Sequence, residues 1–353
     1  MRIGILGYPQ SGKTTLFNVL AKAHASTGAF ASGSGGVNIG TVQVPDPRLE
    51  ALRDMFRPKK YTPARIEYVD LAGAEGHKKE ALLPQQITAS DLILLVVRDF
   101  EDPGVHHPRG SVDPVRDAGD LADELALKDM AVLEGRIERL RKSKQVGAKD
   151  GVSELPLLER CLAALEEGRP LRELELTSEE EKTLRGYQLV TQKPLLVVCN
   201  VGEGDAGGNG PVKAPPESPK METVRISGKA EMEIAELEGD EQRDFMELLG
   251  IRESGLARVI RASYRLLGVC SFFTVGEDEV RAWTIGRGTR AVEAAGTIHS
   301  DLQRGFIRAE VIPAADLLEA GSLPRAKEKH LMRVEGKEYV VADGDVLNIR
   351  FNV

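Results

Sequence analysis

The sequence predicts an α/β protein with a doubly wound parallel sheet, a helical hairpin inserted into that sheet and a separate β-rich domain at its carboxyl end. Three observations predict this fold. Short, apolar, β-branched runs at Ile66 to Leu71, Leu92 to Val97 and Leu195 to Cys199 have the length and composition of buried parallel strands. Between the last two, leucines repeat at helical spacing. Short alternating runs begin near Cys270.

The chain opens with one strand, one loop and one helix. Ile3 to Leu6 is an apolar run, and glycines bound the loop that follows it. The helix is predicted from about Lys13 to Lys22, because its apolar residues recur at helical spacing. These residues are Leu16, Phe17, Val19 and Leu20. The segment is therefore one βα unit of the sheet.

The inserted hairpin is predicted from two helical repeats that flank a turn at Gly147 to Gly151. The first repeat consists of Leu133, Ile137 and Leu140, and the second of Leu155, Leu158, Leu162 and Leu165. The expected tip gathers the basic residues Arg136, Arg139, Arg141, Lys142, Lys144 and Lys149. A solvated helix face and a local contact with RNA are the two interpretations of this charge.

The carboxyl-terminal part is predicted to be a β-rich domain with short strands. The runs are Phe272 to Thr274, Arg281 to Thr284, Arg308 to Val311, Tyr339 to Val341 and Leu347 to Phe351. Asp343-Gly344 is a turn signal between the last two runs. Segments 28–36 and 204–219 are rich in Gly, Ser or Pro and lack hydrophobic periodicity, so both are expected to be mobile loops.

Composition excludes several classes of protein. No apolar run approaches the ~20 residues of a membrane span, and no export signal is visible, so we expect a cytoplasmic protein without a membrane partner. Cys161, Cys199 and Cys270 lack the spacing of a zinc site or a disulfide framework. A formal net charge of -8 argues against general attraction to nucleic acid. We expect no DNA partner, and any RNA must be met locally.

Gly7 to Thr14 reads GYPQSGKT and matches the phosphate-binding loop G-x-x-x-x-G-K-[ST], placed after a strand and opening a helix. Backbone N–H groups of such a loop converge on the β-phosphate, and the helix amino terminus adds partial positive charge. Lys13 is expected on the β and γ oxygens, and the Thr14 hydroxyl on Mg²⁺. The predicted phosphate-binding residues are Gly7, Gln10, Ser11, Gly12, Lys13, Thr14 and Thr15.

The fold class is accordingly a P-loop NTPase of the GTPase-like type. We expect a nucleotide-binding domain from residues 1–116 and 191–268, the helical hairpin at 117–190 and the β-rich domain at 269–353.

Asp70 to Gly73 closes a predicted strand with the pattern D-x-x-G. In this pattern the carboxylate orients a magnesium-bound water and the glycine N–H senses the γ-phosphate. Asp70 is therefore a candidate metal residue and Gly73 a candidate phosphate residue. Ala74 stands where many GTPases carry a glutamine that positions the attacking water. Alanine cannot do this, so hydrolysis is slow or another side chain positions the water.

Asn200 to Glu203 follows a strand at the place where a G domain reads the base, and Ser227-Gly228 is the second loop on that side. Guanine readers use N-K-x-D, whose aspartate accepts from two guanine N–H groups. This chain has neither that lysine nor that aspartate, which favours ATP over GTP. The candidate base-binding residues are Asn200, Val201, Glu203, Ser227 and Gly228. The alternative is that these are ordinary loop residues.

His107 is a candidate for the missing water positioner, since a neutral imidazole can orient or deprotonate water at pH 7. The alternative interpretation is an ordinary histidine on the protein surface.

Together these motifs resemble the Obg-like ATPase (YchF) family, and the resemblance runs from one end of the chain to the other. Besides the phosphate loop, the similar strings include VPDPRL, VDLAG, VVRDFED, VDPVRD, ELALKDMAVLEGRIERL, FTVGEDEVRAWTI, AAGTIH, RGFIRAEVI and a final RFNV. The resemblance implies a GTPase-fold core, a helical insertion, a carboxyl-terminal TGS domain of β-grasp type and a preference for ATP. It also implies that the protein binds ribosomes or ribosomal RNA.

The family resemblance bears on catalysis as well. Family members replace the catalytic glutamine with a hydrophobic residue and use a histidine on the loop after the VVR strand. His107 has the matching spacing, with His106 as the fallback. The family's first switch carries a threonine, and Ser34 stands nearest to its place as a candidate metal residue. Both switch segments depart from the family pattern, so binding of nucleotide is better supported than its hydrolysis.

Three hypotheses follow from the sequence. The first is a Mg²⁺-dependent ATPase with slow hydrolysis, whose nucleotide state is coupled to ribosome binding. The second is a GTPase. The third is a nucleotide-binding ribosome adaptor with little or no turnover, which Ala74 and the altered switches favour.

Overall fold

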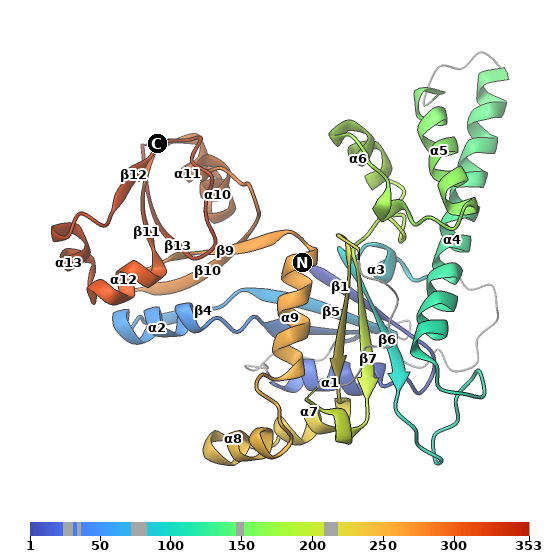
Figure 1. Ribbon diagram of the computed structural model, residues 1–353. Coiled ribbons are helices and arrows are strands. Elements are labelled where there is room, and N and C mark those ends of the chain that lie inside the picture. The colour runs from blue at the N-terminus through green and yellow to red at the C-terminus, as the bar shows by residue number, and fades with distance from the viewer. Residues whose placement is uncertain (24–30, 34–36, 72–82, 146–151, 208–217, 353) are drawn as a thin grey trace. The chain divides into compact units, whose positions relative to one another are not determined.

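The computed structural model describes residues 1–23, 31–33, 37–71, 83–145, 152–207 and 218–352 (Figure 1). Ser34, Gly73, Ala74 and Lys149 lie outside these ranges. By their contacts the residues form two units: Met1–Val42 with Glu67–Leu266, and Gln43–Ile66 with Leu267–Val353. No helix in the described part of the chain is both long and apolar enough to cross a membrane.

The first unit is built on a sheet with the strand order β2-β3-β5-β1-β6-β7-β8. Strands β5, β1, β6, β7 and β8 pair in parallel, whereas β2 and β3 pair antiparallel. Their bounds are β1 Arg2–Leu6, β2 Ala31–Gly33, β3 Val37–Gln43, β5 Arg65–Leu71, β6 Leu92–Asp99, β7 Leu195–Val201 and β8 Met221–Ile226. The α/β fold class and its buried parallel strands are confirmed. Strand β2 lies within a segment that was expected to be a loop.

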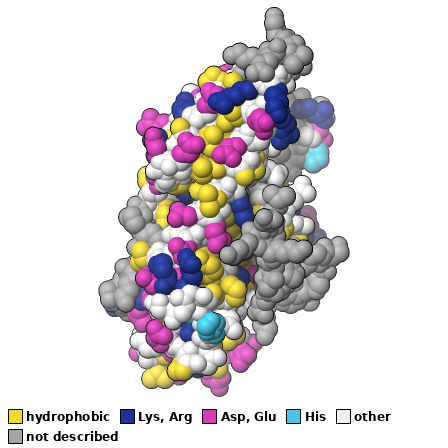
Figure 2. Space-filling model, turned by 90° about the vertical axis from the view of Figure 1, so that its right-hand side faces the viewer, with side chains coloured by type: hydrophobic (Ala, Val, Ile, Leu, Met, Phe, Trp, Pro, Cys, Tyr) yellow, Lys and Arg dark blue, Asp and Glu magenta, His cyan; other side chains and the backbone are white. Residues whose placement is uncertain are grey.

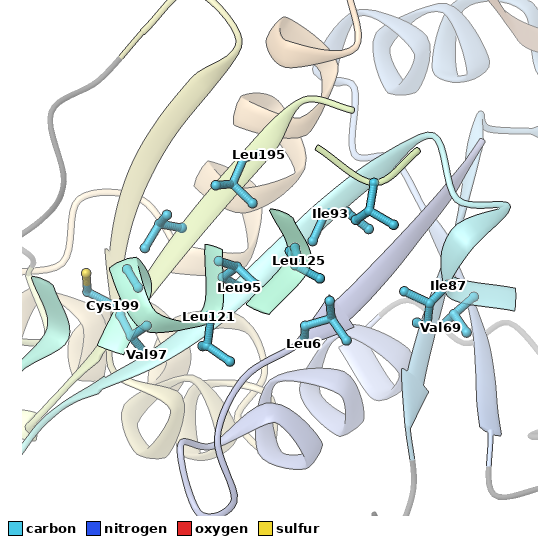
Figure 3. Packing of buried hydrophobic residues seen from close by; sticks show 13 residues of the cluster. Leu6, Val69, Ile87, Ile93, Leu95, Val97, Leu121, Leu125, Leu195 and Cys199 are labelled. Carbon is cyan, nitrogen blue, oxygen red and sulfur yellow. The ribbon is translucent and has the colours of Figure 1, made fainter. Parts of the chain in front are cut away.

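The helices of this unit lie between and after its strands in the chain. They are α1 Lys13–Ala23, α3 Gln85–Thr88, α4 Pro114–Gln145, α5 Leu155–Glu166, α6 Ser178–Arg185, α7 Gly228–Ile234, α8 Gly239–Leu248 and α9 Gly255–Leu266. In the core between α4 and the sheet, Leu121 and Leu125 pack against the strand residues Leu95, Val97 and Cys199 (Figure 3). This packing fixes the first turns of α4 near the carboxyl ends of the strands.

Beyond the sheet, α4 and α5 form the predicted helical hairpin. Leu133, Ile137 and Leu140 of α4 share one apolar core with Leu158 and Leu165 of α5. The spacing of these residues places them on one face of each helix, so both helices bury a continuous stripe. The inserted pair is thus held by its own hydrophobic core.

Asp129 of α4 joins the hairpin to the segment before β7. Its carboxylate accepts hydrogen bonds from the backbone N–H of Val190 (3.0 Å) and from the N–H and hydroxyl of Thr191 (2.7 and 2.6 Å). Burial raises the pKa of Asp129, and the hydrogen bonds from Thr191 oppose this rise. A buried carboxylate with three donors is a strong anchor, because removing it leaves those donors without an acceptor.

Replacing Asp129 with alanine is expected to lower the free energy of unfolding by about 3 kcal/mol. The matched control is Asp123→Ala on the same helix, where the side chain is exposed and the change should be within about 0.5 kcal/mol. Urea unfolding monitored by circular dichroism measures both. Equal effects of the two substitutions would contradict the anchoring role.

Three of the basic residues predicted at the hairpin tip are paired with acids, and the side chains of Lys144 and Lys149 lie outside the described residues. Arg141 Nη2 lies 2.7 Å from Glu159, Lys142 Nζ lies 2.7 Å from Glu138, and Arg136 Nη2 lies 3.4 Å from Glu154. Figure 2 accordingly shows basic and acidic side chains interspersed on this side of the molecule. The arrangement favours a solvated helix face over a concentrated positive patch. The solvated helix face was one of the two interpretations of the sequence, but the individual pairs were not predicted, because the acids come from the facing helix or the preceding turn.

The second unit contains a sheet with the order β12-β11-β13-β9-β10-β4. Its strands are β4 Lys60–Thr62, β9 Val269–Thr274, β10 Glu279–Gly286, β11 Phe306–Pro313, β12 Arg333–Glu335 and β13 Asp345–Phe351. Its helices are α2 Pro47–Phe56, α10 Ala291–Ile298, α11 Ser300–Arg304, α12 Ala314–Ala320 and α13 Leu323–Glu328. The predicted β-rich carboxyl-terminal part is confirmed.

Two details of this unit differ from the expectations. Segment Gln43–Ile66 was assigned to the nucleotide-binding domain, yet its β4 pairs in parallel with β10, and Leu49 and Leu52 join the core of the carboxyl-terminal sheet. Tyr339 to Val341 is not a strand, because its backbone bonds to Ala291 and Thr289 instead. The other domain boundaries stay a prediction.

Candidate functional site

The phosphate loop is shaped by residues with positive φ. Gly7 has φ 154°, Gln10 φ 62° and Gly12 φ 98°. A Cβ at Gly7 would lie 2.3 Å from the carbonyl oxygen of Val96, and one at Gly12 would lie 2.2 Å from Asn200 Nδ2. The glycines are therefore required by close approach as well as by backbone conformation. Gln10 adopts the left-handed region without being glycine, and its side chain is exposed.

Lys13 is the first residue of α1, and its ammonium lies inside the loop. Nζ donates to the carbonyl oxygens of Gly7 (2.9 Å) and Tyr8 (2.7 Å). The next residue, Thr14, is exposed at the amino terminus of the helix, where its hydroxyl is accessible to a cation. The structure thus places the charge of Lys13, the helix terminus and the Thr14 hydroxyl at one loop.

Asp70 completes the possible metal site from β5. It is fully buried and stands in register with Ile5 of the neighbouring strand β1, which leads into the phosphate loop. A buried carboxylate favours a nearby cation, and Mg²⁺ takes carboxylate and hydroxyl oxygens, so the chemistry of Asp70 and Thr14 fits Mg²⁺. Within the described ranges no three His, Cys, Asp or Glu side chains gather as a metal site.

Asn200 ties three segments of the site together. Its Nδ2 donates to the Ser11 carbonyl (3.0 Å), and its Oδ1 accepts from the Gly228 N–H (2.9 Å). It is 7% exposed. In this structure the amide holds the phosphate loop and the loop after β8 in place. A role in reading the base stays a prediction.

The other base-side candidates lie at the ends of β7 and β8. Glu203 Oε2 accepts from Lys229 Nζ at 2.7 Å, and this hydrogen bond raises the pKa of Lys229. The Ser227 side chain caps helix α7 by accepting from the N–H of Ala230, and Val201 is buried. The partner of Glu203, Lys229, was missed by the sequence reading, although it directly follows Ser227-Gly228.

Behind this loop lies a charged cluster that the sequence reading also missed. Arg225 of β8 is 8% exposed and pairs with Asp205 Oδ2 (2.5 Å) and Asp99 Oδ2 (3.4 Å). It links the end of β6 with the segment after β7. The available signal was a charged residue between Val224 and Ile226, two apolar residues of the strand.

His107 is buried, which rules out the interpretation as an ordinary surface residue. The ring is 7% exposed; its Nδ1 accepts from the backbone N–H of Arg109 (3.2 Å), and its Nε2 lies 2.9 Å from Asp117 Oδ2. Both nitrogens therefore face protein groups in this conformation. The fallback residue His106 is exposed.

Replacing Gly12 with alanine is expected to weaken nucleotide binding more than tenfold, because its Cβ would displace the Asn200 amide and the loop backbone. Gly168→Ala is the matched control: Gly168 also has positive φ (75°), but a Cβ there meets open space. Gly168→Ala should lower the free energy of unfolding by about 1 kcal/mol and leave nucleotide affinity unchanged. Equilibrium titration with a fluorescent nucleotide compares the variants, and undiminished binding by the Gly12 variant would contradict this account.

A loop with the phosphate-binding pattern between β1 and α1 of a parallel sheet defines a nucleotide-binding P-loop protein with the GTPase-like fold. Comparisons with known proteins agree. Residues 2–133 match the family described as a 50S ribosome-binding GTPase, and residues 269–352 match YchF-GTPase_C, described as a protein of unknown function.

Two curated relatives carry the name ribosome-binding ATPase YchF. The Bacillus subtilis (strain 168) protein is 44% identical over 361 residues, with 99% of each chain covered. The Escherichia coli O157:H7 protein is 41% identical over 360 residues and covers 100% of this chain and 99% of its own. The solved Schizosaccharomyces pombe YchF GTPase is 28% identical with a TM-score of 0.82, covering 99% of this chain and 97% of that one. The chain belongs to the YchF family, which confirms the resemblance noted from its motifs.

Proposed function

We propose that this protein binds ATP with Mg²⁺, hydrolyses it slowly and couples its nucleotide state to binding of the ribosome. The observation that carries the proposal is the formed phosphate loop, in which Lys13 already lies against the Gly7 and Tyr8 carbonyls. Bound phosphate oxygens would replace these carbonyls as partners of the ammonium. Gly7, Gln10, Ser11, Gly12, Thr15 and Gly73 would supply backbone donors to the phosphates, and Thr14, Asp70 and Ser34 would hold the metal.

The preference for ATP over GTP is supported by the charge at the base-side loop. Guanine recognition needs a carboxylate that accepts from two N–H groups. Here the Glu203 carboxylate is engaged by the Lys229 ammonium at 2.7 Å. The pair is neutral overall, so guanine meets a weaker acceptor than the aspartate of N-K-x-D offers. Asn200, Val201, Ser227 and Gly228 would complete the wall of the base site.

The ribosome partner rests on the names of the relatives, which are called ribosome-binding, and it would place the protein in the cytoplasm. We infer that the β-rich unit is a TGS domain and that the contact with RNA is local, because the net charge is -8.

Turnover with and without ribosomes tests this proposal. Purified protein with Mg²⁺ is expected to release phosphate from ATP faster than from GTP, and EDTA should abolish release. Nucleotide-dependent co-sedimentation with 50S subunits measures the coupling. Tight ATP binding without phosphate release would favour the adaptor hypothesis, and faster release from GTP would favour the GTPase.

A further inference from the structure

The loop that carries His107 has a fixed backbone. The guanidinium of Arg98, at the end of β6, donates to three carbonyl oxygens of this loop: Phe100 (2.9 Å), Val105 (2.9 Å) and Asp102 (3.2 Å). Arg98 is 3% exposed, so these bonds are shielded from water. Arg98 of the core strand β6 therefore holds the backbone of the loop that leads to His107.

A buried carboxylate on a second element faces the ring. Asp117 lies in the first turn of α4 and is 1% exposed. Arg116 donates to Asp117 Oδ1 from Nε (3.0 Å) and Nη2 (2.7 Å), and it also bonds the Ser111 carbonyl. Asp117 Oδ2 is thereby turned toward His107 Nε2. In the described part of the chain no donor is aligned with Asp117 Oδ2 for a full hydrogen bond, although His107 Nε2 lies 2.9 Å from it.

These contacts define where the ring carries its proton. Nδ1 accepts the Arg109 N–H, so Nδ1 has the lone pair. A carboxylate oxygen 2.9 Å from Nε2 would be repelled by a second lone pair, so the proton is on Nε2. The neutral imidazole thus presents its basic nitrogen, Nδ1, on the side away from Asp117.

The first turns of α4 also lie within electrostatic reach of the phosphate loop. The pKa of Tyr8, in that loop, is raised by burial and by the charges of Glu124, Asp120 and Asp117 of α4. Tyr8 packs against the same core as Leu121 and Leu125. The carboxylate that faces His107 thus lies within electrostatic reach of the phosphate loop.

We propose that Asp117 is the positioning residue of His107: it fixes the tautomer with the proton on Nε2, so that Nδ1 accepts a proton from the attacking water. This inference rests on the proposed ATP hydrolysis. A water O–H takes the place of the Arg109 N–H at Nδ1. The water oxygen bonds to the γ-phosphorus while the bond from this phosphorus to the bridging β–γ oxygen breaks. The proton passes to Nδ1, and Asp117 stabilises the resulting imidazolium.

The test compares four variants by steady-state turnover of ATP: Asp117→Asn, His107→Ala, the double variant and Asp123→Asn. Asp117→Asn is expected to lower kcat roughly tenfold or more and to leave KM within about twofold, because binding does not use the imidazole. The double variant should be no slower than His107→Ala alone, since Asp117 acts only through the ring. Asp123→Asn removes the same charge from an exposed site of α4 and should change nothing.

Long-range ¹H–¹⁵N spectra of wild-type protein provide a measurement that needs no variant. They should show the His107 proton on Nε2 in the wild type and a mixture of tautomers in Asp117→Asn. A proton on Nδ1 in the wild type would overturn the inference, even if Asp117→Asn fails to fold.

The kinetic outcomes distinguish the catalytic role of His107 from the positioning role of Asp117. If His107→Ala leaves turnover unchanged, the histidine has no catalytic role, and this inference fails with it. If His107→Ala slows turnover but Asp117→Asn does not, the positioning role alone is overturned. A rise in kcat for Asp117→Asn would also overturn it, because the contact would then hold the ring away from the water.

Discussion

Replacing Lys13 with alanine is expected to weaken ATP binding about a hundredfold, which corresponds to about 3 kcal/mol. The ammonium is the charged donor that the fold places within the phosphate loop, and charge-assisted bonds to phosphate are among the strongest that a protein makes. Lys13 bonds the Gly7 and Tyr8 carbonyls at 2.9 and 2.7 Å, which holds its ammonium at the loop where phosphate oxygens would bind. Isothermal titration calorimetry of nucleotide-free protein measures the change.

Lys59→Ala is the control for charge. Lys59 is exposed, pairs with Asp278 on the surface and belongs to the second unit, so its removal should leave ATP affinity unchanged. A Lys13 variant that binds ATP as tightly as the Lys59 variant would show that nucleotide binds elsewhere.

Replacing His107 with alanine is expected to slow ATP hydrolysis about a hundredfold with little change in ATP affinity. The reason is that Ala74 supplies no group for the water, whereas His107 has the spacing of the family's histidine and is held by Arg109 and Asp117. Single-turnover phosphate release separates this chemical step from binding and product release.

His106→Ala distinguishes the two neighbouring histidines. His106 is exposed, so its removal should leave single-turnover release near the wild-type rate. If His106→Ala slows release while His107→Ala does not, the catalytic assignment moves to the fallback residue. If neither variant is slow, the water is positioned by a group outside this loop.

Most of the sheet could be predicted from the sequence, because buried parallel strands are continuous apolar runs. Ile66 to Leu71, Leu92 to Val97 and Leu195 to Cys199 all lie within strands. Strand β4 could not be predicted, since Lys60–Thr62 is short and polar and forms only through pairing with β10. Tyr339 to Val341 alternates like a strand, but its backbone partners come from Ala291 and Thr289. In both segments the secondary structure depends on pairing with residues far away in the sequence, which local composition does not reveal.

The candidate site also has a part that could be predicted from the sequence and a part that could not. The phosphate loop is a contiguous motif whose geometry depends on its own glycines, so its residues could be read directly. Other contacts of the site join positions far apart in the sequence or on different elements. They are the hydrogen bond of Asn200 to the phosphate loop, the Glu203–Lys229 pair and the Asp117–His107 contact. A sequence motif does not encode such contacts. The pair of Arg141 with Glu159 of the facing helix is likewise a contact that neither helix reveals alone.

The central claim is that this P-loop protein is built for ATP, and comparative calorimetry tests it most directly. Nucleotide-free protein with Mg²⁺ would be titrated with a non-hydrolysable ATP analogue and, separately, with the matching GTP analogue. Because Glu203 is engaged by Lys229, we expect the ATP analogue to bind at least about tenfold more tightly. Tighter binding of the GTP analogue would contradict the account of the base site.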